Sequence, residues 1–526
     1  MSNHRFPPAT GHHSQHIGRG MSQAILPNQE VDLKEFTAIS RASGEDSDVL
    51  DENDLDRRTN ANALTKLLTT WGVESRGIHP VPEHKRTDTQ YHKIFFIWFA
   101  CNLNALSFSA GTLGPLVFGL GVKTSCLVIL FFTFLCSLPP AYLATWGPRL
   151  GLRQMVQARY SFGYFGVIVP CILNLVNMVG FCILNCILGG QTLASVADGN
   201  FSWSVGIVII AMISLLVSFC GYNVLNWYER LAWFPVLVVY LVALGVGGKH
   251  LYDVPPTQPV TPAGILSFAS VVAGFVITYS PLASDFTSYY RPDAPSWRIF
   301  SYTFFGLSIP IITVQCLGAT AAATAPYVPS WEAHSGTAGD LVLAMLGPVG
   351  NFGKFLTVIL ALSVTANIAT TFYSISLNIQ VFVPKLLVVP RYIFSIVATA
   401  IVLPVAIAGS HRFYDTLTNF LSLIGYWASA YVVIVLLEHI LFRRCDFSKY
   451  DLKVWNVPQL LPSGVAAIAA GVLSLALVIP CMDQIWFVGP IAERGAGDIG
   501  FEVAFALTGL LYIPFRAFEI RIRGRL

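Results

Sequence analysis

Charged residues are scarce in this chain of 526 amino acids. Lys, Arg, Asp and Glu make up 12% of the sequence, about half of the roughly 25% found in soluble globular proteins. Hydrophobic residues make up 54%, and the mean hydropathy is +0.61. The composition excludes a soluble domain and indicates an integral membrane protein surrounded by lipid. The net charge of +3 is spread along the chain, and no basic patch with interleaved aromatic residues predicts a nucleic-acid partner.

Catalytic and metal-binding motifs are also missing. The sequence contains no His-Glu-x-x-His, no Gly-x-Ser-x-Gly and no phosphate-binding loop, so nothing in it predicts a membrane-embedded enzyme. Nine of the ten cysteines lie in apolar segments, without the spacing of a zinc site or a disulfide framework. We therefore expect no catalytic residue, no metal site and no cofactor.

The first 90 residues differ in composition from the rest of the chain. They are polar, rich in His, Ser, Asp and Glu, and include the acidic run GEDSDVLDENDLD. Such a segment cannot bury enough apolar surface to offset the entropy of ordering it. We expect a largely disordered cytoplasmic tail over 1–90, a twelve-helix membrane domain over 91–520 and a short cytoplasmic tail over 521–526.

Apolar stretches of about 20 residues, the length that crosses a bilayer, recur along the membrane domain. The sequence predicts twelve such spans, near 94–120, 123–146, 164–190, 203–222, 227–248, 263–286, 298–325, 352–381, 391–409, 415–442, 463–482 and 500–518. We therefore expect an all-α integral membrane fold.

Positive charge is distributed unevenly between the loops. If the N-terminus is inside, the short inner loops carry twelve Lys and Arg residues and the outer loops carry four. Cytoplasmic loops are enriched in Lys and Arg. The bias therefore places both termini in the cytoplasm, which agrees with an even number of spans.

Two of the spans are interrupted by helix-breaking residues. The first contains SFSAGTLGP, with Gly111, Gly114 and Pro115, and the sixth contains TYSPLASD, with Pro281 in mid-run. These spans each begin a set of five, and five is odd, so the two sets run in opposite directions across the membrane. Interruptions at matching places in inverted repeats indicate a LeuT-type 5+5 transporter fold, with spans 11 and 12 at the periphery.

A row of polar side chains runs down one face of the eighth span. Its members, spaced three or four residues apart, are Ser363, Asn367, Thr371, Ser374 and Asn378. Polar groups in mid-membrane either pair across helices or face a substrate path. An amide needs up to four partners, so we expect Asn367 to face a polar cavity.

The third span offers a similar pair. Phe181 lies one turn before Asn185, so that an aromatic ring and an amide point the same way, which suits a planar heteroaromatic ligand. At the break in the sixth span, Thr278 is a further candidate for substrate contact. Ser363 and Thr365 could coordinate a coupling ion, although hydrogen bonds within the helix bundle explain such hydroxyls equally well.

Five motifs resemble one known family. They are VESRGIHPVPEHKRTD before the first span, SFSAGTLGP within it, ARYSFGYFG before the third, SDFTSYYRP after the sixth and FYDTLTNFLSLIGYW in the tenth. In this order and spacing they resemble the fungal purine-cytosine permeases of the nucleobase:cation symporter family, from about residue 70 to the C-terminus.

The resemblance implies a secondary active symporter in the plasma membrane. It would take up purine bases and cytosine by alternating access, coupled to H⁺ and less readily to Na⁺. By position, the family's substrate contacts fall on Ser107 in the first span, on Phe181 and Asn185 in the third, on Phe275 or Val276 in the sixth and on 366–371 in the eighth.

The eighth span departs from the family pattern. Purine-cytosine transporters have a sequence that resembles Ala-Asn-Asn-Ile-Pro-Asn at this place, whereas this chain has Ala-Asn-Ile-Ala-Thr-Thr. Of the three Asn residues only Asn367 is kept, and Thr371 replaces the last one. A transporter for pyridoxine (vitamin B6) or another small flat heterocycle is similar in fold. It remains the alternative prediction for the substrate.

Overall fold

The computed structural model describes residues 77–197, 200–219, 221–252, 259–334, 336–383, 386, 389 and 391–526. The tail predicted to be disordered lies outside these residues, except for 77–90. This last part is packed: Ile78 and Val81 are buried, and Val81 N–H donates to the carbonyl of Gly151 over 2.8 Å. The boundary predicted at residue 90 is therefore too late, because apolar side chains already anchor the chain from residue 78.

The described part of the membrane domain is mainly helical, and its one two-stranded sheet is a short hairpin. Its longer helices are α4 (Lys93–Asn102), α5 (Ala105–Leu116), α6 (Val122–Ala144), α10 (Ile168–Val196), α11 (Trp203–Phe219), α12 (Gly221–Gly247), α13 (Pro262–Ile277), α14 (Ser296–Thr324), α17 (Asn351–Leu362), α18 (Val364–Phe382), α19 (Arg391–Gly409), α20 (Phe413–Leu437), α21 (Val465–Val478) and α22 (Gly500–Arg523).

Short elements connect these helices. They are η1 (Glu83–Lys85), α7 (Trp146–Leu150), α8 (Gln154–Gln157), α9 (Arg159–Gly166), η2 (Gly248–Tyr252), η3 (Ser280–Phe286), η4 (Ala325–Tyr327), α15 (Pro329–Glu332), α16 (Ala338–Leu346), η5 (Gly347–Val349), η7 (Ser410–Arg412), η8 (Glu438–Phe442), η9 (Phe447–Lys449), η10 (Ile479–Cys481), η11 (Ala492–Ala496) and the antiparallel strands β1 (Asp483–Gln484) and β2 (Phe487–Val488).

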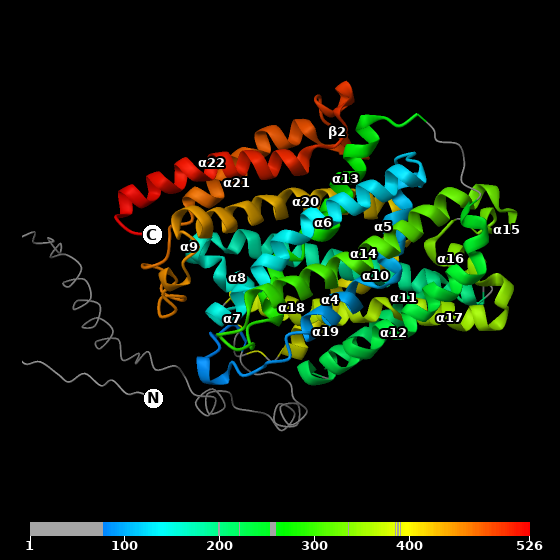
Figure 1. Cartoon of the computed structure of the whole chain (residues 1–526), viewed down its shortest axis with the longest axis horizontal. Coiled ribbons are helices and arrows are strands. Elements are labelled where there is room, and N and C mark those ends of the chain that lie inside the picture. The colour runs from blue at the N-terminus through cyan, green and yellow to red at the C-terminus, as the bar shows by residue number, and fades with distance from the viewer. Residues whose placement is uncertain are drawn as a thin grey trace, which may run out of the picture. The chain divides into compact units, whose positions relative to one another are not determined.

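The helices account for the predicted number of membrane crossings. Among the described residues, eight helices are long and apolar enough to cross a membrane, and the bent pair α4–α5 makes a ninth. One of the eight, Tyr392–Phe442, has 51 residues and comprises α19 and α20, enough for two crossings at about 20 residues each. With the shorter apolar helices α11 and α21 the count reaches twelve. An even number places 77–92 and the C-terminus at the same end of the bundle, here termed the terminal face (Figure 1).

The first span is broken between α4 and α5, which are bent by 54°. Asn104 has extended backbone angles, and its side-chain oxygen caps α5 by accepting from Ser107 N–H over 2.9 Å. Other helices bond the remaining free groups: Ser363 Oγ accepts from Ala105 N–H at 3.1 Å, and Tyr240 OH donates to the Asn104 carbonyl at 2.8 Å. The break is thus a junction held by hydrogen bonds from several helices.

The break was predicted at Gly111, Gly114 and Pro115, and this position is wrong. All three lie within α5, with Pro115 in its last turn. Gly111 instead allows close helix packing, because a Cβ there would lie 2.0 Å from the carbonyl oxygen of Gln315 on α14. Small residues in membrane helices serve this purpose as often as they interrupt a helix.

The sixth span is interrupted next to Pro281. The α-helix α13 ends at Ile277, Thr278 and Tyr279 form a turn, and the chain continues as the 3₁₀-helix η3, whose first turn contains Pro281. Proline lacks an N–H and cannot continue the α-helical ladder. Both predicted interruptions, in spans 1 and 6, are therefore present, and two sets of five crossings begin with them.

Helices α21 and α22 lie side by side at one edge of the bundle, next to α20 (Figure 1). A buried ion cluster joins α22 to the end of α20. The Glu438 carboxylate accepts from Arg516 Nε at 2.8 Å, from its second guanidinium nitrogen at 2.9 Å and from Tyr512 OH at 2.9 Å, and Arg443 Nε lies 3.2 Å away. Such bidentate pairs have fixed geometry, so the peripheral pair is held in a defined position.

At the opposite face a buried carboxyl group joins α20 to the segment before α22. The Asp498 carboxylate accepts from Tyr426 OH, from Gln484 Nε2 at 2.7 Å and from Gly500 N–H at 3.0 Å. Burial raises the pKa of Asp498 to about 6, although the hydrogen bond from Tyr426 acts to lower it. Ser267 on α13 accepts from Asp498 N–H over 2.9 Å, so this junction also contacts the sixth span.

We expect Gly111→Ala to lower the melting temperature of the detergent-purified protein. The added methyl group would overlap the Gln315 carbonyl, and overpacking of this kind costs about 1–3 kcal/mol. Gly471→Ala on α21 is the matched control, since a Cβ there meets no atom within 4 Å. It should leave the melting temperature unchanged or slightly higher. Equal melting temperatures for the two variants would contradict the close packing of α5 on α14.

A second prediction concerns pH. Because the folded-state pKa of Asp498 is about 6 and that of an unfolded Asp is about 4, folding favours the protonated form. The contribution of Asp498 to the free energy of unfolding is therefore present at low pH and is lost as the pH rises from about 4 to about 6. Relative to wild type, Asp498→Asn should be increasingly stable between pH 5 and pH 7 in thermal unfolding. Glu493→Gln, at an exposed position in the same loop, should show no such trend.

Candidate functional site

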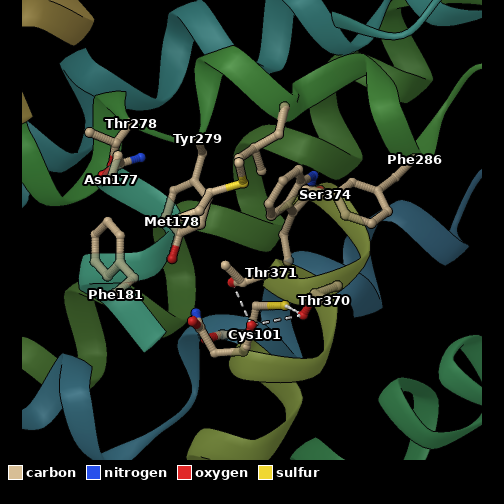
Figure 2. Close-up of a pocket in the computed structure, with 13 residues that line it drawn as sticks. Cys101, Asn177, Met178, Phe181, Thr278, Tyr279, Phe286, Thr370, Thr371 and Ser374 are labelled. Atoms are coloured by element: carbon tan, nitrogen blue, oxygen red, sulfur yellow. Dashed lines mark hydrogen bonds between the residues drawn. The ribbon is translucent and has the colours of Figure 1, made fainter. Parts of the chain in front are cut away.

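A cavity lies where the two interrupted spans meet α10 and α18. Its lining residues come from α4, from α10, from the turn and 3₁₀-helix after α13, and from α18: Trp98, Cys101, Asn177, Met178, Phe181, Thr278, Tyr279, Leu282, Phe286, Asn367, Thr370, Thr371 and Ser374. Figure 2 shows how these side chains converge. The free space is about 30 Å³, enough for about two water molecules. A larger ligand enters only when lining side chains move apart.

Four of the predicted substrate contacts line this cavity, namely Phe181, Thr278, Asn367 and Thr371. They come from three different helical segments, which the sequence could not place side by side. Phe181 and Thr278 lie on one side of the cavity, and Thr371 lies across from them (Figure 2). The helix pair α10 and α18, in direct contact along their length, brings them together.

Three other predicted contacts lie behind the lining. Ser107 is buried in the first turn of α5, where its Oγ donates to the Asn102 carbonyl over 2.6 Å. Asn185 lies behind Asn367 and donates from Nδ2 to its Oδ1 over 3.0 Å. Phe275 packs edge-on against the ring of Phe181, with ring centres 6.0 Å apart. These three residues support the lining side chains.

Asn367 connects the cavity to the break in the first span. Its Nδ2 donates to the carbonyl of Cys101 over 3.1 Å, while its Oδ1 accepts from Asn185. Next to it, Thr370 Oγ1 lies 3.1 Å from the thiol of Cys101. The last turn of α4 is therefore held against α18 by side chains that also face the cavity.

Aromatic rings form the wall nearest the terminal face. Trp98 contacts Tyr279 and Phe286 edge-on, with ring centres 5.2 and 5.4 Å apart, and Tyr279 OH donates to Asn102 Oδ1 over 2.7 Å. Phe286 also packs on Tyr373 at 5.8 Å. Ring faces and edges of this kind accommodate a flat ligand.

Below this wall, packed residues lie between the cavity and the terminal face. Arg153, buried between α7 and α8, donates to the Asp285 carbonyl at the end of η3, and its guanidinium lies over the rings of Tyr289 and Tyr373 at 5.2 and 5.9 Å. The segment 81–88 covers the same region: Asp88 N–H donates to Tyr289 C=O, and Arg291 N–H donates to Asp88 C=O, both over 3.2 Å. This packing separates the cavity from the terminal face.

The sequence reasoning did not assign Trp98, Cys101, Met178, Leu282 or Phe286 to the site. An aromatic, aliphatic or sulfur-containing side chain in a membrane helix gives no signal that separates a cavity wall from helix packing or lipid contact. The polar residues Asn177, Tyr279 and Ser374 stood in polar clusters of spans 3, 6 and 8. The spacing of these polar residues along their spans was the one signal that could have assigned them to the site.

The two candidate ligands of a coupling ion lie at the start of α18. Ser363 Oγ accepts from Ala105 N–H and donates to the Leu360 carbonyl at 2.6 Å. Thr365 Oγ1 is buried and has no hydrogen-bond partner within the described part of the chain. Neither residue lines the cavity.

The lining contains amides, hydroxyls, one thiol and aromatic rings, and no Asp, Glu, Lys, Arg or His. Within the described residues, no group of three or more His, Cys, Asp or Glu side chains could hold a metal ion. An uncharged cavity with flat rings and a few polar groups suits a neutral, planar, hydrogen-bonding ligand.

Two known transporters are similar to this chain in sequence. The chain is 36% identical to the purine-cytosine permease fcyB of Emericella nidulans over 470 residues, which cover 88% of this chain and 92% of that protein. It is 29% identical to the vitamin B6 transporter TPN1 of Saccharomyces cerevisiae, covering 88% of this chain and 90% of that one.

A solved structure shares the fold. Mhp1, a nucleobase-cation-symport-1 family transporter in a closed conformation with bromovinylhydantoin bound, superposes with a TM-score of 0.67 at 17% identity and covers 85% of this chain and 96% of its own. The fold is thus the LeuT-type inverted repeat that the two interrupted spans indicated. Residues 80–496 match the family described as permeases for cytosine/purines, uracil, thiamine and allantoin. The chain therefore belongs to this family, whose members are permeases and not enzymes.

Proposed function

We propose that the protein is a symporter that takes up purine bases and cytosine across the plasma membrane. Both termini lie in the cytoplasm, so that the terminal face is the inner one. The observation that carries the proposal is the uncharged cavity at the meeting point of the two interrupted spans, where Phe181, Asn367 and Tyr279 combine flat rings with an amide. The identity of 36% to a purine-cytosine permease supports it.

The geometry gives each half of the site a role in alternating access. The contacts that Arg153 makes with Asp285 and with the rings of Tyr289 and Tyr373, together with the segment 81–88, close the inner side. On the other side Phe420 of α20 packs edge-on against Phe181, with ring centres 5.4 Å apart. Transport requires these two closures to open in turn, while the ligand stays between them.

We propose H⁺ as the coupling ion, with Na⁺ as the less favoured choice. The cavity lining carries no carboxylate, so a proton would bind outside it. Thr365, buried with a hydroxyl that has no hydrogen-bond partner among the described residues, remains the better candidate of the two for an ion ligand, because Ser363 already bonds the first span.

The alternative substrate is pyridoxine or another small flat heterocycle. Two observations favour it. The chain is similar to the vitamin B6 transporter TPN1, and it has the hydroxyl side chains of Thr370 and Thr371 where the pattern of purine-cytosine transporters has Pro and Asn. A hydroxylated pyridine would suit these hydroxyls, although both already donate within α18.

A competition experiment separates the two substrates. Uptake of radiolabelled cytosine, in cells that lack their own nucleobase transporters, should fall when unlabelled adenine or hypoxanthine is added and stay unchanged with pyridoxine. Uptake should be faster at pH 5 than at pH 7 and independent of Na⁺. Competition by pyridoxine alone would replace the proposed substrate, and a requirement for Na⁺ would replace the proposed ion.

Asn367→Ala should raise the apparent KM for uptake by about tenfold or abolish transport. It removes the bond to the Cys101 carbonyl and leaves Asn185 without its acceptor, and such losses cost about 1–3 kcal/mol. Asn378→Ala on the same helix is the control, because Asn378 Nδ2 bonds the Cys171 carbonyl at 2.6 Å and lies outside the cavity lining. With equal amounts of both variants in the membrane, an unchanged KM for Asn367→Ala would remove this residue from the site.

A further inference from the structure

Most polar groups of the cavity are already engaged in hydrogen bonds within the protein. Both functional ends of the Asn367 amide are used, by Cys101 and by Asn185. Thr371 Oγ1 donates to the Asn367 carbonyl at 2.6 Å, and Thr278 Oγ1 donates to the Gly274 carbonyl at 3.0 Å. These residues shape the cavity, but have few donors left for a ligand.

Three lining side chains differ from these. Asn177 Oδ1, Ser374 Oγ and Trp98 Nε1 are buried and have no hydrogen-bond partner in the described part of the chain. Asn177 and Ser374 are each 2% exposed. Buried polar atoms are nearly always paired, because leaving them unpaired costs free energy. Their position in the cavity wall indicates that a ligand supplies the missing partner.

We propose that Asn177 is a specificity-determining residue that reads the hydrogen-bonding edge of the ligand, assisted by Ser374. This inference rests on the proposed function. Asn177 lies on α10 one turn before Phe181, so that one helix presents an amide and an aromatic ring to the same cavity. In Figure 2 Asn177 lies beside Thr278 and Phe181, while Ser374, which belongs to α18, lies towards Phe286. A ligand between them meets polar groups at two separate edges.

The hydrogen-bonding groups of the Asn177 amide indicate which class of ligand would bind. An Asn side chain offers one acceptor and two donors next to each other, and pairs bidentately with an edge that carries an adjacent donor and acceptor. Amino-substituted ring nitrogens, as in adenine and cytosine, and ring lactams, as in hypoxanthine, have such an edge. Trp98 Nε1 adds a donor at the wall of aromatic rings. We infer a preference for heterocycles with an amidine or lactam edge.

A second asparagine on α10 provides a matched control. Asn174 is also 2% exposed, and its Oδ1 also has no partner within the described ranges, but it does not line the cavity. A general need for polar residues in α10 would affect both positions equally. Direct recognition of the ligand affects Asn177 alone.

The test compares inhibition constants in the labelled-cytosine uptake assay. Asn177→Leu should weaken inhibition by adenine and hypoxanthine by about tenfold or more. It should change little for analogues in which a methyl group already blocks the amidine or lactam edge. Asn174→Leu should preserve the wild-type ratio of the inhibition constant of a blocked analogue to that of the free base. Ser374→Ala should reduce this ratio by a smaller factor than Asn177→Leu does. Should Asn177→Leu fail to reach the membrane, Asn177→Asp keeps the volume, removes the donors and should give the same loss of discrimination.

The outcomes distinguish the inference from the proposed function. If the wild-type protein takes up or binds no nucleobase, the proposed function fails and the inference fails with it. If the wild type transports cytosine but the Asn177 variants show the wild-type ratio of inhibition constants for blocked and free analogues, the inference alone is overturned. Equal loss of discrimination in the Asn174 and Asn177 variants would also overturn it, because it would indicate a structural role of the helix.

Discussion

The absence of water in the bilayer core is the constraint on which this structure depends. A backbone group released from a helix there must find a partner within the protein. The first span meets this requirement at Asn104, where a side chain caps α5 and where hydroxyls from Ser363 and Tyr240 reach the freed main chain. A break can exist only where neighbouring helices supply these groups, and the arrangement of the surrounding spans follows from this.

The same requirement explains why the cavity forms at this place. Side chains that satisfy the break, above all Asn367, also face the space beside it. The remaining wall consists of aromatic rings, which need few hydrogen-bond partners. As a result, structural support and the cavity lining share one set of residues, and only a few lining atoms, on Asn177, Ser374 and Trp98, have no hydrogen-bond partner among the described residues.

The apolar spans, their order and the presence of two interruptions were predictable from the sequence, because apolar length and helix-breaking residues are local properties. The place of the first break was not. Glycine at position 111 relieves contact between helices, which in sequence looks the same as a helix break, whereas the real signal was Asn104, a residue type that favours the N-cap of a helix. Within the candidate site, Phe181, Asn367 and Thr371 were predicted from polar and aromatic periodicity, and Thr278 from its place at the break in the sixth span. Trp98 and Met178 were missed because apolar residues are common on every face of a membrane helix.

The contact between α5 and α14 has a mechanical consequence. A Cβ at Gly111 would lie 2.0 Å from the Gln315 oxygen, and one at Gly318 would lie 2.1 Å from that of Phe108, so the two backbones touch at points on both helices. Helix α14 also approaches α4 closely, since a Cβ at Gly306 would lie 2.8 Å from the carbonyl oxygen of Phe95. One helix therefore braces both halves of the broken first span, on either side of Leu103 and Asn104.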